Sequence, residues 1–423
     1  MRLEGKFVAI GGKSGVGKTT LINKLVEIYP EMKRPVSYTT RKRRENESGA
    51  EYKFISESEI KQLYENGKLV NLDFNYGNYY GMDKEGLLKE LENEGSFMIK
   101  EIHPQYHEKI KVVLGDNVIS VLIKGLGCDS ENRGRELEDG NFYEKKKEIL
   151  FDLVFIYDRN CSVEENARLF YHKLLTYVGT MDKFPPAKNI DMENYTGYSM
   201  VAEEFTEERR ITTRNFHEVS KKFWNSVLVE VEKNKKILEL GPGNGWLRNS
   251  FSWPEVKYYC LDITENMAAI ANEENGIVAS ARCIPVESRS MDYVFASLAD
   301  PYFYPQVLCE VHRILKDKGW FALTLPDKEW ADNLRGKGNN TTTFVLDKGT
   351  EANVFSFTFD DKEIEQLVNM CGFSLEKLEH LTGLEIINNE ISPAIIKSSN
   401  NAKKDLTELK IVTAVILQKR KDY

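Results

Sequence analysis

Short apolar runs alternate with amphipathic stretches in two parts of this chain. In the first part, the runs at 6–12, 95–102, 118–127 and 151–158 are typical of buried strands, and residues 19–27 are typical of a helix that follows a glycine-rich turn. Strands that alternate with helices form mainly parallel sheets covered by helices. The pattern therefore predicts a first α/β domain over residues 1–179.

A second alternating part follows a polar helical stretch at 201–233. It opens on a strand in KKILELGPGNG (235–245) and closes on a strand in IVTAVILQKRK (411–421). Between the two parts, residues 180–199 contain Pro185-Pro186 and little apolar periodicity, which predicts a linker. A second domain is therefore expected over residues 200–423.

Composition narrows the classes of partner. The chain has 423 residues and a net charge of −8, whereas nucleic-acid binders are usually basic because they neutralise phosphates. The acidic balance argues against nucleic acid and favours small anions held in local pockets. The first fifteen residues lack the apolar core of a signal peptide, and no stretch approaches the roughly 20 apolar residues of a membrane span. We expect a cytoplasmic protein without membrane contact, and the oligomeric state stays open.

The strongest local motif is Gly12-Lys-Ser-Gly-Val-Gly-Lys18-Thr19, which matches G-x-x-x-x-G-K-[ST] between a strand and a helix. Backbone N–H groups of such a loop surround phosphates, the lysine reaches the β- and γ-phosphates, and the Thr hydroxyl binds Mg²⁺. The motif predicts ATP and Mg²⁺ as ligands. The predicted ATP-binding residues are Gly12, Ser14, Gly15, Gly17, Lys18, Thr19 and Thr20.

A cationic run at 41–44 stands out in this acidic chain. It contains Arg41, Lys42, Arg43 and Arg44. Two guanidinium groups can grip one phosphate bidentately, and tyrosine hydroxyls can complete its shell. The alternative is a solvated basic surface.

Four collinear motifs resemble guanylate kinases in order and spacing: the glycine loop at 12–19, SYTTRKRR at 37–44, EYKF at 51–54 and GNYYG at 77–81. The resemblance implies a P-loop kinase with a parallel sheet that moves the γ-phosphoryl group of ATP onto a nucleoside monophosphate. Arg133 and Arg135 resemble that family's lid arginines. By resemblance, the catalytic residues are Lys18, Arg41, Arg44, Arg133 and Arg135, and the acceptor's phosphate is held by Ser37, Arg41, Arg44, Tyr52 and Tyr80.

The positions that read the base depart from that family. Asn71 stands where the family has a Glu that pairs with guanine, Met82 where it has Ser or Thr, and His103 where it has a second acid. Asn offers a donor and an acceptor, so we expect altered base selection, with GMP, a pyrimidine or a modified nucleotide all open. Glu101 keeps a carboxylate nearby, to support Mg²⁺ or the acceptor phosphate.

A second glycine-rich loop lies in ILELGPGNG, and an acid, Asp262, ends the next strand about 20 residues on, where a ribose diol is typically held. Together with SMDYVFASL and VHRILKDKGWFALTLP, these residues resemble class I S-adenosylmethionine-dependent methyltransferases, which implies a Rossmann-like domain with a seven-stranded sheet. By resemblance, the cofactor contacts are Glu239, Gly241, Gly243 and Asp262, with Ser280 at the adenine-reading position.

Asp300-Pro301-Tyr302 resembles a shortened form of the [DNS]-P-P-[YFW] signature of amino-group methyltransferases. A carboxylate and an aromatic ring there would orient a planar amine, which makes Asp300 a candidate catalytic residue. The alternative is an ordinary aromatic loop.

Together these motifs predict a bifunctional enzyme that phosphorylates a nucleoside monophosphate and methylates a small molecule, possibly a nucleotide, with S-adenosylmethionine. The alternative is that the kinase-like half is a regulatory or binding module for a methyltransferase that acts on nucleic acid or protein.

Overall fold

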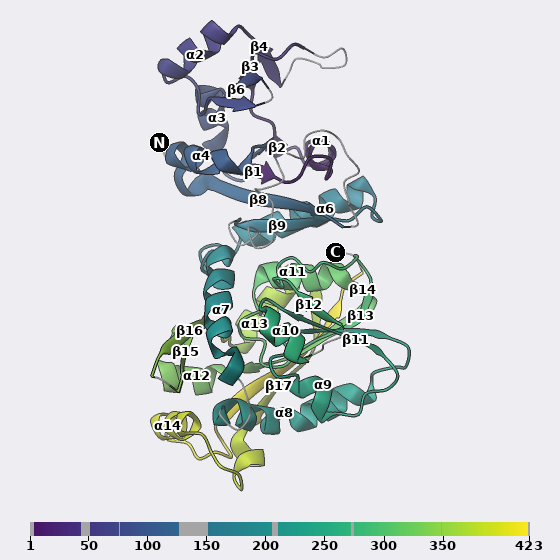
Figure 1. Cartoon of the computed structure of the whole chain (residues 1–423). Helices are drawn as coiled ribbons and strands as arrows, with labels where there is room; N and C mark the ends of the chain where they lie inside the picture. The colour runs from purple at the N-terminus through teal and green to yellow at the C-terminus, as the bar shows by residue number, and fades with distance from the viewer. Residues whose placement is uncertain are drawn as a thin grey trace. The chain divides into compact units, whose positions relative to one another are not determined.

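The computed structural model describes residues 4–43, 51–75, 77–126, 151–204, 210–271, 275–347 and 349–421. It divides the chain into two compact units, Met1–His172 and Lys173–Tyr423, hereafter unit 1 and unit 2 (Figure 1). The boundary falls inside one continuous helix, α6 (Val163–Val178), so both units contain part of it.

A five-stranded parallel sheet forms the centre of unit 1, in the order β2-β7-β1-β8-β9. All four apolar runs predicted as strands in this part of the chain belong to it, and the predicted helix is α1 (Lys18–Ile28). The strands are β1 (Lys6–Gly11), β2 (Met32–Lys33), β7 (Phe97–Glu101), β8 (Val118–Gly125) and β9 (Leu153–Tyr157). The other helices are α2 (Glu57–Glu65), α3 (Lys84–Leu91), η1 (Pro104–Tyr106), α4 (His107–Leu114) and η2 (Gly115–Asn117).

A second, smaller sheet in unit 1 consists of β4 (Tyr52–Phe54), β3 (Ser37–Thr39), β6 (Asn78–Met82) and β5 (Asp73–Asn75), in that order. Directly paired residues in a sheet present their side chains on the same face, and residues two apart on a strand share that face. The register therefore defines one face, here called the Ser37 face. Its paired residues are Tyr52, Phe54, Ser37, Thr39, Asn78, Tyr80, Met82, Asp73 and Asn75.

Unit 2 is built on a seven-stranded sheet in the order β12-β11-β10-β13-β14-β18-β17, in which β18 runs antiparallel to both neighbours and the other pairs are parallel. The seven-stranded prediction is confirmed. The strands are β10 (Lys236–Leu240), β11 (Lys257–Asp262), β12 (Gly276–Val278), β13 (Met291–Ala296), β14 (Leu315–Pro326), β17 (Phe373–Thr382) and β18 (Lys410–Lys419). Unit 2 also contains a separate antiparallel hairpin of β15 (Thr341–Val345) and β16 (Glu351–Phe355).

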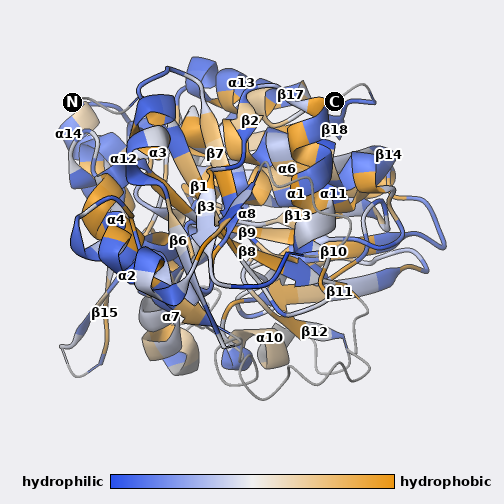
Figure 2. Ribbon diagram, turned by 90° about the horizontal axis from the view of Figure 1, so that it is seen from above, coloured by the Kyte–Doolittle hydropathy of each residue, from blue (hydrophilic) through white to orange (hydrophobic). Residues whose placement is uncertain are grey.

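Helices cover both faces of this sheet, because its strands are apolar on both sides. On β10, Leu238 and Leu240 pack into a core with α7, α11 and α13, whereas Ile237 packs with α8 and α9 on the opposite face. Figure 2 shows helices with both blue and orange sides, as this packing requires. The helices are α7 (Ala187–Val201), η4 (Ala202–Glu204), α8 (Ile211–Val229), α9 (Trp246–Ser250), α10 (Glu265–Ala271), α11 (Pro305–Ile314), α12 (Lys328–Arg335), α13 (Asp361–Met370), η5 (Gly383–Ile386) and α14 (Pro393–Ala402).

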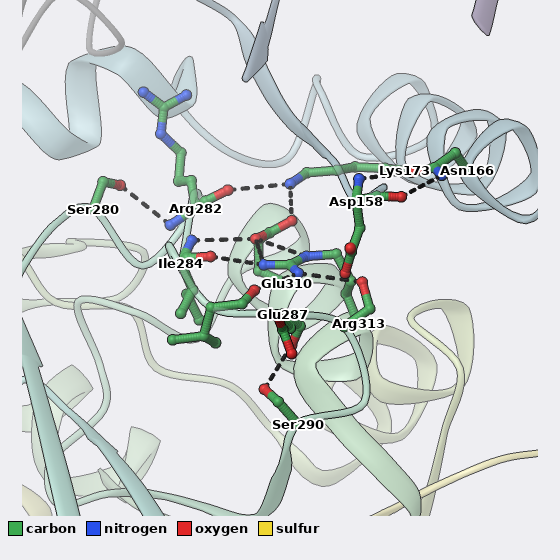
Figure 3. A network of polar contacts seen from close by, with 12 residues as sticks. Asp158, Asn166, Lys173, Ser280, Arg282, Ile284, Glu287, Ser290, Glu310 and Arg313 are labelled. Carbon is green, nitrogen blue, oxygen red and sulfur yellow. Dashed lines mark hydrogen bonds and ion pairs between the residues drawn. The ribbon is translucent and has the colours of Figure 1, made fainter. Parts of the chain in front are cut away.

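A buried group of charges lies beside the core of unit 2 (Figure 3). Glu310 of α11 accepts hydrogen bonds from Lys173 Nζ at 2.8 Å and from Arg313 Nη2 at 2.9 Å. Their side chains are only 5%, 1% and 2% exposed for the lysine, the glutamate and the arginine. The backbone N–H of Ile284 also donates to Glu310. Each charge in this network therefore has a partner, as buried ions require.

The structure differs from the predicted linker at 180–199. Pro186 occupies the N-cap of α7, so the proline pair precedes a helix rather than interrupting one. Ile190 is fully buried and Asn194 Oδ1 accepts a hydrogen bond from the backbone N–H of Phe355, so this segment is part of the packed unit 2.

Among the described residues, the model contains no helix with the length and apolar character needed to cross a bilayer.

Candidate functional sites

The glycine loop of unit 1 turns from β1 into α1. Gly17 is the N-cap of α1 with φ of 105°, a conformation that side chains rarely adopt. Lys18 Nζ donates to the carbonyl oxygens of Gly12 and Lys13 at 2.7 and 2.9 Å, so its ammonium lies over the loop. The other residues predicted to bind ATP lie in the same loop or in the first turn of α1: Ser14, Gly15, Thr19 and Thr20.

The two residues predicted to support Mg²⁺ are in direct contact. The Thr19 hydroxyl at the start of α1 donates to Glu101 Oε1 at 2.5 Å, and Glu101 is the last residue of β7. Parallel strands place their carboxyl ends at one edge of the sheet, which brings the end of β7 to the loop that follows β1. Hydroxyl and carboxylate oxygens are ligands that Mg²⁺ prefers, with water and phosphate oxygens filling the remaining positions.

Three of the predicted acceptor-phosphate residues, Ser37, Tyr52 and Tyr80, lie on the Ser37 face. Ser37 is fully buried and lies opposite Tyr52, and Tyr80 lies two residues before Met82 on β6. The Arg41 guanidinium lies 5.2 Å from the centroid of the Tyr52 ring. Burial, followed by the charge of Glu101, raises the pKa of Tyr52, so this phenol is a hydrogen-bond donor at neutral pH.

Lys100 of β7 also belongs to this group, although it was not among the predicted site residues. Its ammonium donates to the Ser37 hydroxyl and lies 5.0 Å from the centroid of the Tyr52 ring. Burial, and then the charge of Arg34, lowers its pKa to about 8. The signal was available in FMIKEI, where a lysine and a glutamate follow three apolar residues of a predicted strand.

The three predicted base-reading positions are not equivalent in the structure. Asn71 donates to Asp73 Oδ2 at 2.6 Å and accepts from the backbone N–H of Met82 at 3.1 Å, so both ends of its amide are engaged. The Met82 side chain is 1% exposed and packs in the core of unit 1 beside β1 and β7, rather than forming an open wall. His103 is half-buried, follows β7 and contacts the Tyr106 ring.

Three predicted catalytic residues, Arg44, Arg133 and Arg135, lie outside the described residues. Their roles as a second phosphate clamp and as lid cations stay predictions.

Unit 2 contains a cavity of about 590 Å³, a size typical of ligand sites. Its wall includes the glycine-rich loop after β10, the end of β11, the loop after β13 and parts of α8, α12 and the β15–β16 hairpin. The cavity therefore lies at the carboxyl ends of the parallel strands, where α/β folds bind ligands. The predicted site residues on its wall are Glu239, Gly241, Gly243, Asp262 and Asp300.

Two buried carboxylates on the cavity wall are held in place by hydroxyl and amide groups. Glu239 Oε2 accepts from the Tyr258 hydroxyl at 2.8 Å, and burial raises its pKa to about 7. Asp262 Oδ1 accepts from the backbone N–H and the hydroxyl of Thr264 at 2.8 and 3.0 Å, and burial raises its pKa to about 6. Both acids are positioned before any ligand binds.

The loop after β13 places Asp300 on the wall of the same cavity as the glycine-rich loop after β10. The ring of Tyr302 packs so closely on Gly241, whose φ is 58°, that a Cβ there would meet ring carbon Cε2 at 2.2 Å. Asp300 is 9% exposed on the same cavity wall, and burial raises its pKa to about 6. A carboxylate and a phenol therefore lie on the wall of the cavity that contains the glycine-rich loop, and the catalytic role of Asp300 stays a prediction.

Ser280 does not join this set. Its hydroxyl donates to Asp191 Oδ2 at 2.6 Å, and the same oxygen accepts from Arg282 Nε at 2.7 Å. Asp191 comes from α7, so the segment predicted to be a linker supplies the partner that engages this serine.

Comparisons with known proteins follow the division into units. A family model described as guanylate kinase matches residues 4–144. The guanylate kinase of Lactobacillus acidophilus is 34% identical over 157 residues, which cover 35% of this chain and 76% of that protein. The chain belongs to the guanylate kinase family. The guanylate kinase of Shouchella clausii is 34% identical over 165 residues, which cover 37% of this chain and 79% of that protein.

The similarity to guanylate kinases is confined to the first part of the chain. A solved guanylate kinase from Anaplasma phagocytophilum is 27% identical and covers 41% of this chain and 86% of its own, with a TM-score of 0.34. A family model described as methyltransferase domain matches residues 238–323, so unit 2 carries a methyltransferase domain. A putative S-adenosylmethionine-dependent methyltransferase from Listeria monocytogenes is 16% identical and covers 48% of this chain and 100% of its own, with a TM-score of 0.35.

Proposed function

We propose that this guanylate kinase family member is a bifunctional enzyme. Unit 1 phosphorylates a nucleoside monophosphate with ATP, with base selection altered from the family's pattern, and unit 2 methylates a small molecule with S-adenosylmethionine. The observation that carries the proposal is a continuous set of contacts in unit 1. Thr19 of the glycine loop contacts Glu101, the neighbouring Lys100 lies over Tyr52, and Tyr52 lies under Arg41.

The donor side fits a triphosphate with Mg²⁺. A Cβ at Gly15 would enter open space, so the loop backbone is accessible to phosphate oxygens, and Lys18 needs only to exchange two carbonyl partners for them. Bound Mg²⁺ would neutralise charge on the phosphates. Thr19 and Glu101 supply the oxygen ligands that orient it, directly or through water.

The acceptor side fits a phosphate monoester. Arg41, Lys100 and the hydroxyl of Tyr52 converge from β7 and from the small sheet, and they supply positive charge and hydrogen-bond donors to one anion. Their role is to hold the monoester in line with the donor, since phosphoryl transfer asks the protein mainly for positioning and charge stabilisation. Arg41 is the residue of this group proposed to act directly on the transferring phosphate.

In unit 2, the proposal gives Glu239 and Asp262 the role of binding the cofactor, with Asp262 accepting hydrogen bonds from a ribose diol. Asp300 accepts a hydrogen bond from the nucleophilic amine of the methyl acceptor and so orients its lone pair. The methyl group is supplied by S-adenosylmethionine. Burial raises the pKa of Asp300 to about 6. Near neutral pH this group can therefore accept a hydrogen bond as a carboxylate and can also take up a proton.

One mass-spectrometric screen tests both halves. The full chain is incubated with ATP, Mg²⁺, S-adenosylmethionine and a panel of natural and modified nucleoside monophosphates, and products that gain a phosphate, a methyl group or both are scored. We expect Lys18→Ala to abolish phosphate addition while methyl addition continues. Asp300→Asn is expected to slow methyl addition while phosphate addition continues.

The exposed Lys89→Ala serves as the matched control for Lys18→Ala, since it removes an ammonium from α3, away from the glycine loop. A wild-type chain that transfers phosphate to no member of the panel and binds no ATP would contradict the kinase assignment and favour a binding module. Methyl transfer to an oligonucleotide or a protein, but to no small molecule, would contradict the proposed acceptor class.

A further inference from the structure

Asp73 lies on the Ser37 face, on the strand β5 that pairs with β6. It is paired directly with Tyr80, which in turn is paired with Thr39, so its side chain belongs to the Ser37 face. The same face carries Tyr52 and Ser37, the residues that contact Lys100. A monoester held by these groups therefore has Asp73 on the same face, two strands from Ser37 and in the neighbouring row of side chains, that of Thr39 and Tyr80.

Asp73 also carries an unsatisfied acceptor. The residue is 4% exposed, and its Oδ2 accepts the amide of Asn71, but its Oδ1 is buried and has no hydrogen-bond partner in the part of the chain that the structure describes. A buried carboxylate oxygen without a donor is costly, and native structures rarely retain one. A ligand N–H group would remove that cost.

Asn71, at the position of the guanine-reading Glu, has its amide oriented by two protein partners in the observed arrangement. Its carbonyl oxygen already accepts from the Met82 backbone and its amide nitrogen already donates to Asp73. Asn71 acts as a support that orients the neighbouring carboxylate. The carboxylate thus lies two residues further along the chain, at the first position of β5.

We propose that Asp73 determines base selection by accepting, at Oδ1, a hydrogen bond from an N–H group of the acceptor's base. This inference rests on the proposed kinase function and narrows its substrate to nucleoside monophosphates with an amino or imino N–H at that point. Asp73 is a specificity-determining residue, and the phosphoryl transfer itself remains with Lys18 and Arg41.

The electrostatic surroundings favour an ionised carboxylate at neutral pH. Burial raises the pKa of Asp73 to about 6, against the hydrogen bond from Asn71 and the charges of Lys109 on α4 and Lys100 on β7. Tyr106, another titratable neighbour, is a neutral phenol there, because burial and Asp73 raise its pKa. At pH 7.5 the side chain is therefore an acceptor on both oxygens.

The test compares each accepted nucleotide with an analogue that lacks one N–H donor, through removal of an amino group or N-methylation. We expect wild type to prefer the intact nucleotide in one such pair by about 10- to 100-fold in kcat/KM, the range for a hydrogen bond to a charged group. Asp73→Asn should lose that preference through the acceptor's KM, with the KM for ATP and the methylation rate unchanged. Asp116→Asn, which neutralises an exposed carboxylate of unit 1, should behave as wild type.

A second measurement needs no variant. The preference of wild type within the discriminating pair should fall about tenfold between pH 7.5 and pH 5, as the carboxylate takes up a proton, and the titration of the nucleotide's own phosphate cancels in the ratio. An Asp73→Asn variant that folds, binds ATP and keeps the full preference would overturn the inference alone, as would a wild-type preference that does not change with pH. A wild type that phosphorylates no nucleotide would overturn the proposed function and this inference with it.

Discussion

Lys100 gives the acceptor site a cation whose charge changes in an accessible pH range. Burial, then Arg34, lowers its pKa to about 8, while Glu51, Asp73 and Glu101 act in the opposite direction. The protonated lysine therefore predominates below pH 8 and the neutral amine above it. Only the protonated form adds positive charge beside Tyr52, so the acceptor's phosphate should bind best below pH 8.

The size of the effect follows from that pKa. With a value of about 8, about nine-tenths of the lysine is charged at pH 7 and about one-tenth at pH 9. If the charged form alone binds the monoester well, the acceptor's KM rises about tenfold over this range. The monoester itself contributes little, because its second ionisation, with a pKa of about 6, is nearly complete at pH 7.

Steady-state kinetics at pH 7, 8 and 9 measures the effect as the KM for the acceptor, with the KM for ATP as an internal reference. Lys100→Arg keeps its charge throughout and should give a flat profile, and Lys100→Met should give a raised KM that is also flat. Lys89→Arg, on the exposed side of α3, should follow wild type. The same rise in Lys100→Arg as in wild type would refute the reasoning.

Three further predictions concern unit 2. Gly241→Ala should weaken S-adenosylmethionine binding at least tenfold by titration calorimetry, because its Cβ collides with the ring packed against it and φ is 58°, whereas Gly349→Ala has open space and should not. Asp262→Asn should weaken the same binding about 10- to 100-fold while the kinase rate is unchanged. Glu310→Gln should lower the free energy of unfolding by about 3–5 kcal/mol in denaturant titrations, since it leaves two buried cations short of a partner, and exposed Glu287→Gln by under about 0.5 kcal/mol.

Glu310 also makes the stability of the protein depend on pH. Burial alone would raise its pKa, but Arg313 and Lys173 hold the pKa of Glu310 below its usual value of 4.5. A lowered pKa means that the stabilisation is complete above pH 4.5 and is lost as the pH falls through the folded-state value. The difference in stability between wild type and Glu310→Gln should therefore shrink in acid, and a difference that does not depend on pH would contradict this account.

The sequence predicted those features that depend on local pattern. Short contiguous segments are enough to predict the strands of unit 1, the seven-stranded sheet of unit 2 and the glycine loops. The sequence also assigned both Thr19 and Glu101 to Mg²⁺, and the structure places the two side chains in contact, because the carboxyl ends of neighbouring parallel strands meet.

Features that depend on pairing register were not foreseen. The segment LVNLDFNYG does not reveal that the Asn71 amide hydrogen-bonds to Asp73 and to the backbone of Met82. These contacts depend on how β5 aligns with β6. The hydrogen bond from Ser280 to Asp191 was not foreseen for a similar reason, because Asp191 comes from a distant helix that was interpreted as a linker on account of its proline pair.

The course of α6 has a practical consequence for dissecting this protein. A gene cut at residue 180, where composition suggests a seam, would leave Lys173 on the kinase fragment and deprive Glu310 of one of its two cationic neighbours. A methyltransferase fragment made that way would be weakened at its own core before any assay began. Cloning boundaries should instead keep the whole of α6 with unit 2. Fragments that differ only in that helix would show how far unit 1 and unit 2 fold independently.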